Sequence, residues 1–297
     1  MQYIEGLKEY TDTGKSAVTF GKFDGLHRGH QKLVERVKAY EEQQGVKSAL
    51  CAFDMNGRNI LMTKEERKER LQDVDYLVNC PFSDEFRHME AEEFISKIIK
   101  GVFHADYVVV GTDFHFGYGQ KGNADFLKEY MEKYDYHAVV VEKERYRGRE
   151  ISSTYIKEVV QDGDMELART LLGYHYRVNG VVEHGEQLGK TLGFPTINVA
   201  WPKEKILPPL GVYVSRICVD GIWYNGISNV GIKPTVSNCE RVLVESYLFG
   251  YSGDAYNKKV RIDFLEFHRL ERKFQSVDAM KSCVETDIHY GENYFQR

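Results

Sequence analysis

The 297-residue sequence contains few cysteines, five in all, and none of them forms a CxxC pair. This scarcity argues against a zinc site and against a disulfide framework, because both need paired or clustered thiols. It fits a protein that works in a reducing compartment, and we therefore expect a cytoplasmic location.

Long apolar runs and an excess of positive charge are also absent. No stretch approaches the roughly 18 apolar residues of a membrane span, and residues 1–6 lack the order of a signal peptide. The formal net charge is −5, so no overall field would attract nucleic acid. We expect small-molecule substrates, no nucleic-acid or membrane partner, and a monomer or weak homo-oligomer.

The sequence divides into two halves with different patterns of apolar and charged residues. Its length suits two domains of about 150 residues each. In the first half, apolar runs alternate with charged, helix-favouring segments such as residues 64–71 and 91–99. The strand-like runs are residues 17–20, 49–53, 107–111 and 138–141. This alternation is typical of an α/β domain with a parallel sheet.

After about residue 175, alternating runs punctuated by glycine replace the helical segments. These runs are residues 176–182, 212–219, 223–230, 243–249 and 260–267. Asp220 and Gly221, between two of the runs, form a strong hairpin signal. Strands at such short intervals, without helices between them, predict a small antiparallel β-barrel.

Two helical segments flank the predicted barrel. Residues 153–172 are expected to bridge the halves, with Asp164 as an N-cap and Gly173 as a C-terminal stop. We place the domain boundary there, which gives domains of residues 1–173 and 174–297. A terminal helix is expected to begin after Ser276 as its N-cap. Its apolar face would comprise Val277, Met280, Val284 and Ile288.

The first motif, TFGKFDGLHRGH, leads from a predicted strand into a helix. Gly21, Gly25 and Gly29 allow backbone amides to come close to a ligand, as a phosphate-binding loop requires. His27 and His30 lie three residues apart at the positive end of the helix dipole, so both can face one anion. The alternative is a glycine-rich turn with two surface histidines, which suits a lone HxGH better than this longer string.

This motif resembles the nucleotidyltransferase loop of bacterial FAD synthetases, and two further stretches agree with that family. Residues 110–117, VGTDFHFG, match its VGxDFxFG segment, and residues 151–154 match its ISST motif. The resemblance implies a Rossmann-like nucleotidyltransferase domain in which His27 and His30 are catalytic. It also implies nucleotide contacts from Gly21, Phe23, Gly25, Gly29, Ser152, Ser153 and Thr154, and flavin contacts from Asp113 and Phe114. Taken alone, the two serines would be ordinary helix N-caps.

The sequence departs from this family after its second predicted strand. Residues 53–58 read FDMNGR where the family has a Phe-x-Pro-His-Pro segment. Loss of both prolines, around Met55, is expected to loosen a loop that in relatives lies near the flavin and ATP sites. Lys157 stands where arginine is common, which keeps the charge but not the bidentate fork.

The second motif, GEQLGKTLGFPTIN, ends at Asn198 and resembles the riboflavin kinase loop GxxxGxxLGFPTxN. The resemblance implies that Thr196 and Asn198 contact the metal and the nucleotide, and their hydroxyl and amide oxygens suit Mg²⁺. Phosphate contacts are implied for Gly185, Gly189, Lys190, Gly193 and Pro195. A proline-containing turn into a strand is the structural alternative for the PTIN segment alone.

Two charged residues complete the expected kinase site. Glu245 falls where the riboflavin kinase family places its catalytic carboxylate, although a solvated edge residue is the alternative. As a general base it would accept the proton of the riboflavin 5′-hydroxyl while the γ-phosphoryl group transfers. Arg269 matches a late R.E..F segment, which implies a flavin or phosphate contact, with a salt bridge on the barrel as the alternative.

The resemblance extends over nearly the whole chain and implies a bifunctional riboflavin kinase and FMN adenylyltransferase. Such an enzyme uses ATP and Mg²⁺ to convert riboflavin to FMN, and then ATP to convert FMN to FAD with release of pyrophosphate. Two alternatives stay open at this point. One is a riboflavin kinase with an impaired adenylyltransferase half, and the other is a flavin-binding regulatory protein.

Overall fold

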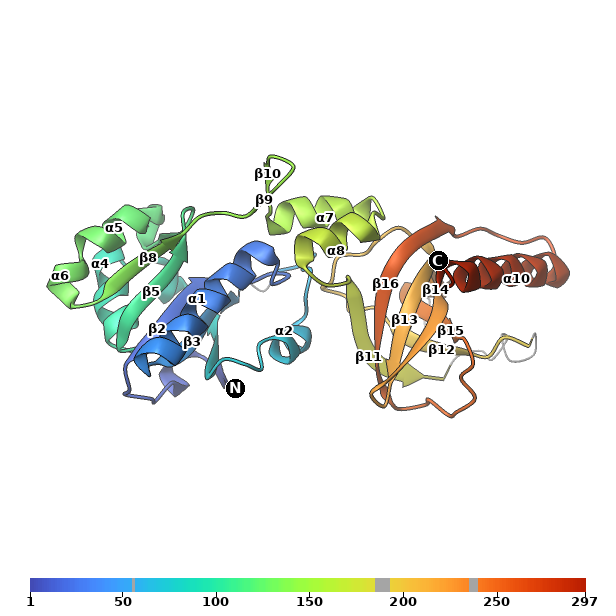
Figure 1. Cartoon of the computed structure of the whole chain (residues 1–297), viewed down its shortest axis with the longest axis horizontal. Coiled ribbons are helices and arrows are strands. Elements are labelled where there is room, and N and C mark those ends of the chain that lie inside the picture. The colour runs from blue at the N-terminus through green and yellow to red at the C-terminus, as the bar shows by residue number, and fades with distance from the viewer. Residues whose placement is uncertain (55–56, 185–192, 235–239) are drawn as a thin grey trace. The chain divides into compact units, whose positions relative to one another are not determined.

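The computed structural model describes residues 1–54, 57–184, 193–234 and 240–297. These residues divide into two units, Met1–Ser153 and Thr154–Arg297, which are described separately below (Figure 1). The expected α/β and β-barrel architectures are both confirmed. Among the described helices, none is long and apolar enough to cross a membrane.

A six-stranded parallel sheet forms the centre of the first unit, in the order β1-β4-β3-β2-β5-β8. Four of its strands coincide with the predicted apolar runs and two were not predicted. The predicted ones are β2 (Ser16–Gly21), β3 (Lys47–Asp54), β5 (Ala105–Gly111) and β8 (His137–Val141). The others are β1 (Gln2–Glu5) and β4 (Tyr76–Pro81). In β1 only Ile4 is buried, and β4 contains the polar Asn79, so neither presents a continuous apolar run.

Helices and short hairpins connect these strands. The helices are α1 (Arg28–Gln44), α2 (Lys64–Arg70), α3 (Asp84–Arg87), α4 (Ala91–Glu93), α5 (Ala124–Glu129) and α6 (Met131–Tyr134), with a π-helix η2 (Phe94–Lys100) and 3-10 turns η1 (Leu7–Glu9) and η3 (Tyr118–Gln120). The hairpins pair β6 (His115–Phe116) with β7 (Gly122–Asn123) and β9 (Arg145–Tyr146) with β10 (Arg149–Glu150). The predicted helix 91–99 is therefore one α-turn followed by a π-helix.

The direction in which the chain adds successive strands to the sheet changes between β2 and β5. From β2 the chain passes through α1 to β3 on one side, and after β4 it crosses to β5 on the other side. Ligands of open α/β sheets bind outside the carboxyl ends of the strands at such a reversal. The loop after β2 and the loop after β5 both start at this point.

Two helices, α7 (Ser153–Gln161) and α8 (Met165–Leu172), follow the parallel sheet. The two predicted helix signals, the Asp164 N-cap and the Gly173 stop, are both confirmed. The Asp164 carboxylate accepts a hydrogen bond from the Leu167 amide at 2.9 Å, and Gly173 ends α8 with a φ of 78°. A left-handed residue at this position is the usual glycine C-terminal stop.

Six antiparallel strands close into a barrel in the second unit, in the order β11-β12-β15-β14-β13-β16. They are β11 (Arg177–Glu183), β12 (Thr196–Ala200), β13 (Gly211–Val219), β14 (Ile222–Pro234), β15 (Glu240–Leu248) and β16 (Lys259–Leu270). Asp220 and Gly221 turn the β13–β14 hairpin with φ values of 51° and 81°, as its sequence predicted. Two positive φ values are what a type I′ turn requires.

The helix α10 (Val277–Tyr294) lies beside the barrel and packs against β13 and β14 (Figure 1). Its N-cap is Ser276, as predicted, with the Ala279 amide 3.1 Å from the serine hydroxyl. Val277 begins the predicted apolar face but is 57% exposed, so the packed face begins about one turn later, at Met280.

Candidate active sites

The loop after β2 turns sharply before α1 begins. Phe23 and Leu26 have φ values of 48° and 40°, and Gly25 between them has a φ of 84°. Side chains other than glycine rarely adopt this left-handed region, so such residues concentrate at functional sites. The turn ends at His27, which occupies the N-cap position of α1.

The two predicted catalytic histidines stack on each other at this helix end. The ring centroids of His27 and His30 are 3.8 Å apart with 22° between the planes. The edge of the Phe23 ring contacts His30, with 5.3 Å between the centroids. Both Nδ1 atoms are buried and neither has a hydrogen-bond partner among the described residues.

Burial sets the charge of this histidine pair. It lowers the pKa of His27 to about 4, against small opposing effects of Asp24 and Asp113. It also lowers the pKa of His30 well below its usual range, and the neighbouring His27 adds to that shift. Both rings are therefore neutral near pH 7, and each keeps one N–H group that can donate to a phosphate oxygen.

The ISST segment lies against the same loop, although about 125 residues of sequence separate the two motifs. The Ser153 hydroxyl donates a hydrogen bond to the Asp24 carbonyl at 2.8 Å. A Cβ atom at Gly29 would lie 3.3 Å from the His27 ring and 3.9 Å from the Ile151 carbonyl, so glycine allows this close approach. Ser152 is partly buried, and Thr154 is exposed.

The predicted flavin contacts follow β5, the strand next to β2. Asp113 pairs with Lys143 at 3.1 Å. The Phe114 ring stacks on Phe116 and on Phe20, with centroid distances of 5.5 and 6.2 Å. Asp113 thus pairs with the segment that follows β8, whereas Phe114 belongs partly to the aromatic core. Met55, in the segment that departs from the family, lies outside the described residues.

A second site lies on the outer face of the barrel. Asn198 on β12, Glu245 on β15 and Asn229 on β14 are direct cross-strand partners and form one row. Adjacent strands are about 4.8 Å apart, so these side chains converge on one place. The arrangement places the predicted base directly beside a predicted metal ligand.

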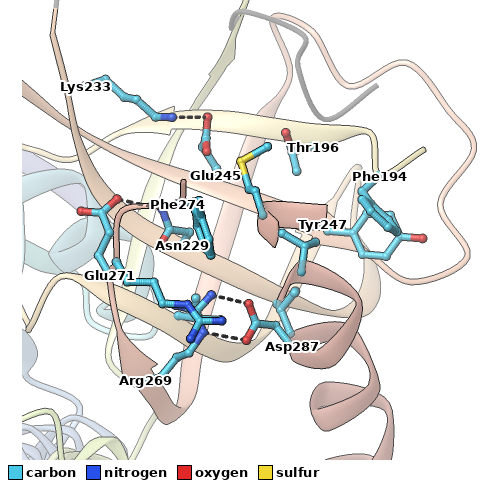
Figure 2. Close-up of a pocket in the computed structure, with 15 residues that line it drawn as sticks. Phe194, Thr196, Asn229, Lys233, Glu245, Tyr247, Arg269, Glu271, Phe274 and Asp287 are labelled. Atoms are coloured by element: carbon cyan, nitrogen blue, oxygen red, sulfur yellow. Dashed lines mark hydrogen bonds and ion pairs between the residues drawn. The ribbon is translucent and has the colours of Figure 1, made fainter. Parts of the chain in front are cut away.

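Glu245 and Asn229 of this row line a cavity of about 300 Å³ that lies between the barrel and α10 (Figure 2). Glu245 and Lys233 lie on one side of it, and Arg269 lies on the other. The remaining lining residues are Phe194, Thr196, Val212, Ile227, Asn229, Tyr247, Glu271, Arg272, Phe274, Met280, Val284 and Asp287. Aromatic and aliphatic walls with a few charged groups suit a flat, largely apolar ligand with polar edges.

Glu245 has a charged partner in this cavity. Lys233 approaches its carboxylate at 3.4 Å, and the Glu245 side chain remains 30% exposed. Glu271 accepts a long hydrogen bond of 3.4 Å from the Asn229 amide. The Glu245 carboxylate therefore borders the cavity, where it is accessible to the hydroxyl group of a bound ligand.

The residues present fit a hard divalent cation. Asn198 is 7% exposed and its side-chain oxygen has no hydrogen-bond partner among the described residues, while Thr196 on the same strand face lines the cavity. An unsatisfied buried amide oxygen costs free energy unless something binds it, and Mg²⁺ accepts such a ligand together with phosphate oxygens. In the described part of the chain, no group of three or more His, Cys, Asp or Glu residues could hold a metal.

The remaining predicted phosphate contacts divide into two groups. Gly193, with a φ of 91°, and Pro195 are exposed on either side of Phe194. Gly185, Gly189 and Lys190 lie outside the described residues.

Comparison with known proteins agrees with this two-site architecture. Residues 9–155 match the FAD synthetase family, and residues 172–295 match the riboflavin kinase family. The bifunctional riboflavin kinase/FMN adenylyltransferase of Bacillus subtilis is 32% identical over 96% of this chain and 94% of its own. The chain belongs to the bifunctional riboflavin kinase/FMN adenylyltransferase family.

Other relatives cover both halves equally well. The family member from Haemophilus influenzae is 32% identical over 99% of each chain. A crystal structure described as a macrolide-efflux protein from Streptococcus pneumoniae has a TM-score of 0.86 and 28% identity, over 96% of this chain and 97% of that one. Membership of the family makes the protein an enzyme that phosphorylates riboflavin to FMN and adenylylates FMN to FAD.

Several lining residues of the kinase cavity were not predicted as site residues, notably Tyr247, Asp287 and Phe194. Tyr247 is two residues after Glu245 on the same strand face, so strand alternation could have indicated it. Asp287 lies seven residues after Met280, which is two helical turns along the same face of α10. Neither pattern distinguishes a residue that lines a site from one that packs in the core. That distinction requires knowing which barrel strands face α10.

Proposed function

We propose that the barrel carries the kinase reaction with Glu245 as its general base. The row of Asn198, Glu245 and Asn229 across three strands is the observation that supports this assignment. The Glu245 carboxylate would take the proton of the riboflavin 5′-hydroxyl, whose oxygen then attacks the γ-phosphorus of ATP, and ADP leaves. The cavity walls would hold the isoalloxazine ring so that the hydroxyl points at the carboxylate.

Mg²⁺ belongs to this proposal through Thr196 and Asn198. The amide oxygen of Asn198, which has no hydrogen-bond partner in the described part of the chain, supports a ligand at this place. When bound, the ion would neutralise charge on the phosphate oxygens of ATP. The protein residues would hold the ion and the nucleotide beside Glu245.

The His27 and His30 pair would serve adenylyl transfer in the first unit. An FMN phosphate oxygen attacks the α-phosphorus of ATP, the bond to the β-phosphate oxygen breaks, and pyrophosphate leaves. No protein nucleophile is needed, so the protein positions the reactants and stabilises charge. Two neutral imidazoles at the positive end of α1 are suited to donate hydrogen bonds to the phosphate oxygens.

The domain boundary in this proposal falls between residues 173 and 174. The FAD synthetase match ends at residue 155 and the riboflavin kinase match begins at residue 172, so most of α7 and α8 lies between them. We further propose a cytoplasmic enzyme that is a monomer or weak homo-oligomer. The four described cysteines are all free thiols, which supports a reducing compartment.

The test is chromatography of the flavins formed by the pure protein with excess ATP and Mg²⁺, starting from riboflavin in one reaction and from FMN in another. FAD from both reactions is expected. FMN that accumulates without FAD would contradict the assignment of adenylyl transfer to the histidine loop, and the kinase assignment would stand.

A further inference from the structure

Lys233 reaches the kinase cavity from the end of β14. It is the cross-strand partner of Arg241, four residues beyond Asn229, so its Cα atom lies about 13 Å along the strand from the row that contains Glu245. The side chain nevertheless returns to that row, with Nζ 3.4 Å from the Glu245 carboxylate. An ammonium group is thus held at the place where the riboflavin hydroxyl would lose its proton.

The Glu245 carboxylate has the proposed metal ligands on one side and this ammonium group on the other. Asn198, one of those ligands, is its cross-strand partner on β12. In the view of Figure 2, the carboxylate lies between Lys233 and Thr196, the second proposed ligand. A phosphoryl group that approaches a hydroxyl beside Glu245 would therefore have positive charge within reach on either side.

Two other cations are present among the described residues that line the cavity, and both have contacts elsewhere. Arg269 forms a bidentate ion pair with Asp287, and Arg272 lies 5.3 Å from the centre of an aromatic ring of the lining. Arg269 lies across the cavity from Glu245, whereas Lys233 is on the same side (Figure 2). Lys233 is therefore the cation that the described lining places beside the base.

A second carboxylate increases the need for positive charge at this place. Glu271 accepts a hydrogen bond of 3.4 Å from Asn229, and its Oε1 would lie 2.4 Å from a Cβ atom at Gly231. Gly231 lies between Asn229 and Lys233 on one strand face, so this carboxylate is close to the row. The phosphates of ATP would add further negative charge, which a preorganised cation offsets as the phosphoryl group transfers.

We propose that Lys233 is a catalytic residue of the kinase reaction and binds the γ-phosphoryl oxygens during transfer. This role rests on the assignment of Glu245 as the base. The riboflavin 5′-hydroxyl gives its proton to Glu245 and its oxygen forms a bond to the γ-phosphorus. The bond from the γ-phosphorus to the oxygen that bridges it to the β-phosphate breaks, and ADP leaves. Negative charge meanwhile spreads over the equatorial oxygens of the γ-phosphoryl group.

Proton transfer changes the charge that the lysine faces. Before the reaction, the Glu245 carboxylate balances the ammonium charge, so Lys233 adds little to the binding of ATP. Once Glu245 is protonated, its carboxyl group is neutral and the ammonium charge acts on the phosphoryl oxygens. An interaction that is stronger in the transition state than in the ground state raises kcat. Lysine suits this role because its flexible stem and several N–H donors can contact both groups.

The experiment measures the single-turnover rate of FMN formation by the full-length protein with saturating riboflavin, ATP and Mg²⁺. Lys233→Met should lower this rate by about 10²–10³-fold, the usual cost of removing one charge-stabilising donor. Riboflavin affinity from flavin fluorescence and the KM for ATP should change less than about threefold, because the interaction strengthens only during transfer. Lys233→Arg keeps the charge and should recover most of the rate.

Lys258→Met is the matched control. The Lys258 side chain is 39% exposed, as is that of Lys233, and it pairs with the Asp220 carboxylate at 2.6 Å. Neither residue of that pair is in the cavity lining. The substitution therefore removes the same charge and a similar ion pair from the same unit, and the rate of FMN formation should not change.

The double variant Lys233→Met/Glu245→Gln separates direct contact with the phosphoryl group from an effect through the base. Loss of the lysine should slow the Glu245→Gln enzyme by a further factor of about ten or more, because two residues with separate roles have separate costs. No further loss, or a wild-type rate of Lys233→Met alone, would overturn the role of Lys233. A wild-type rate of Glu245→Gln would instead overturn the assignment of the base.

Discussion

Arg269 and Asp287 join the last barrel strand to the C-terminal helix by two parallel hydrogen bonds, at 2.8 Å from Nε and 2.5 Å from Nη2 (Figure 2). The Asp287 side chain is only 3% exposed, and His268 approaches its carboxylate at 3.3 Å. Bidentate geometry fixes direction as well as distance. The pair therefore holds α10, with its cavity residues Met280 and Val284, against the kinase site.

Asp287→Asn should loosen this wall of the cavity. The substitution leaves Arg269 without its carboxylate, and breaking a buried ion pair costs about 3–5 kcal/mol. We expect riboflavin to bind about tenfold more weakly, with kcat for FMN formation changed less than threefold, because Glu245 is untouched. Flavin fluorescence gives the affinity, and initial rates give kcat and KM.

The control for this substitution is Glu266→Gln. Glu266 accepts a hydrogen bond from Tyr290 and so ties the same strand to the same helix outside the cavity lining. Similar KM changes in both variants would mean that general loosening of α10, and not the Arg269 pair, explains the effect.

The sequence alone predicted Arg269 as a flavin or phosphate contact or as a salt bridge, and it could not choose. The choice depends on Asp287, eighteen residues later, which only the packing of α10 on the barrel brings near. Long-range pairs of this kind have no local sequence signal. By contrast, Asp164, Gly173 and Ser276 act on backbone groups a few residues away, and all three were predicted correctly.

The strands show the same distinction. Runs of buried apolar residues, as in β2 and β5, stand out in the sequence, whereas β1 buries only Ile4 and is held by pairing with β4. The first motif was recognisable in part because its backbone needs glycine at Gly25, with a φ of 84°, and at Gly29, where a Cβ atom would lie 3.3 Å from the His27 ring. Stacking of His27 on His30 was beyond reach, since it depends on ring orientation.

Glu245→Gln should slow FMN formation by about 10²–10⁴-fold, the usual effect of losing a general base. The amide keeps the size of the side chain, so riboflavin affinity should stay within about threefold. FAD formation from supplied FMN should be unchanged and serves as the internal control. Turnover at the wild-type rate would remove Glu245 from the mechanism.

His30→Ala should abolish FAD formation and leave FMN formation intact, because the histidine pair and the kinase cavity belong to different units. The ring is buried, so His30→Gln is made in parallel to limit the cavity that alanine leaves. Chromatography of the flavins from riboflavin and ATP measures both steps at once. If both activities disappear in both variants, misfolding replaces a catalytic role as the explanation.

Asn198→Ala should raise the Mg²⁺ concentration needed for half-maximal FMN formation, by about tenfold or more. The amide oxygen of Asn198 is buried and no described residue hydrogen-bonds to it, and its removal takes away a proposed ligand of the ion. Asn229→Ala, in the same row of side chains, is the control and should leave the Mg²⁺ requirement unchanged. Equal shifts in the two variants would speak against direct metal contact by Asn198.

Acid should destabilise the first unit through its buried histidines. The pKa of His27 is about 4 in the folded protein and about 6.5 when unfolded, so between these values only the unfolded chain binds the proton. The contribution of His27 to stability is therefore complete above about pH 6.5 and falls by about 1.4 kcal/mol per pH unit below it. Both tryptophans lie in the second unit, so hydrogen exchange of the β2 amides is the measurement. His27→Gln should reduce this slope, and substitution of the exposed His88 by glutamine should leave it unchanged.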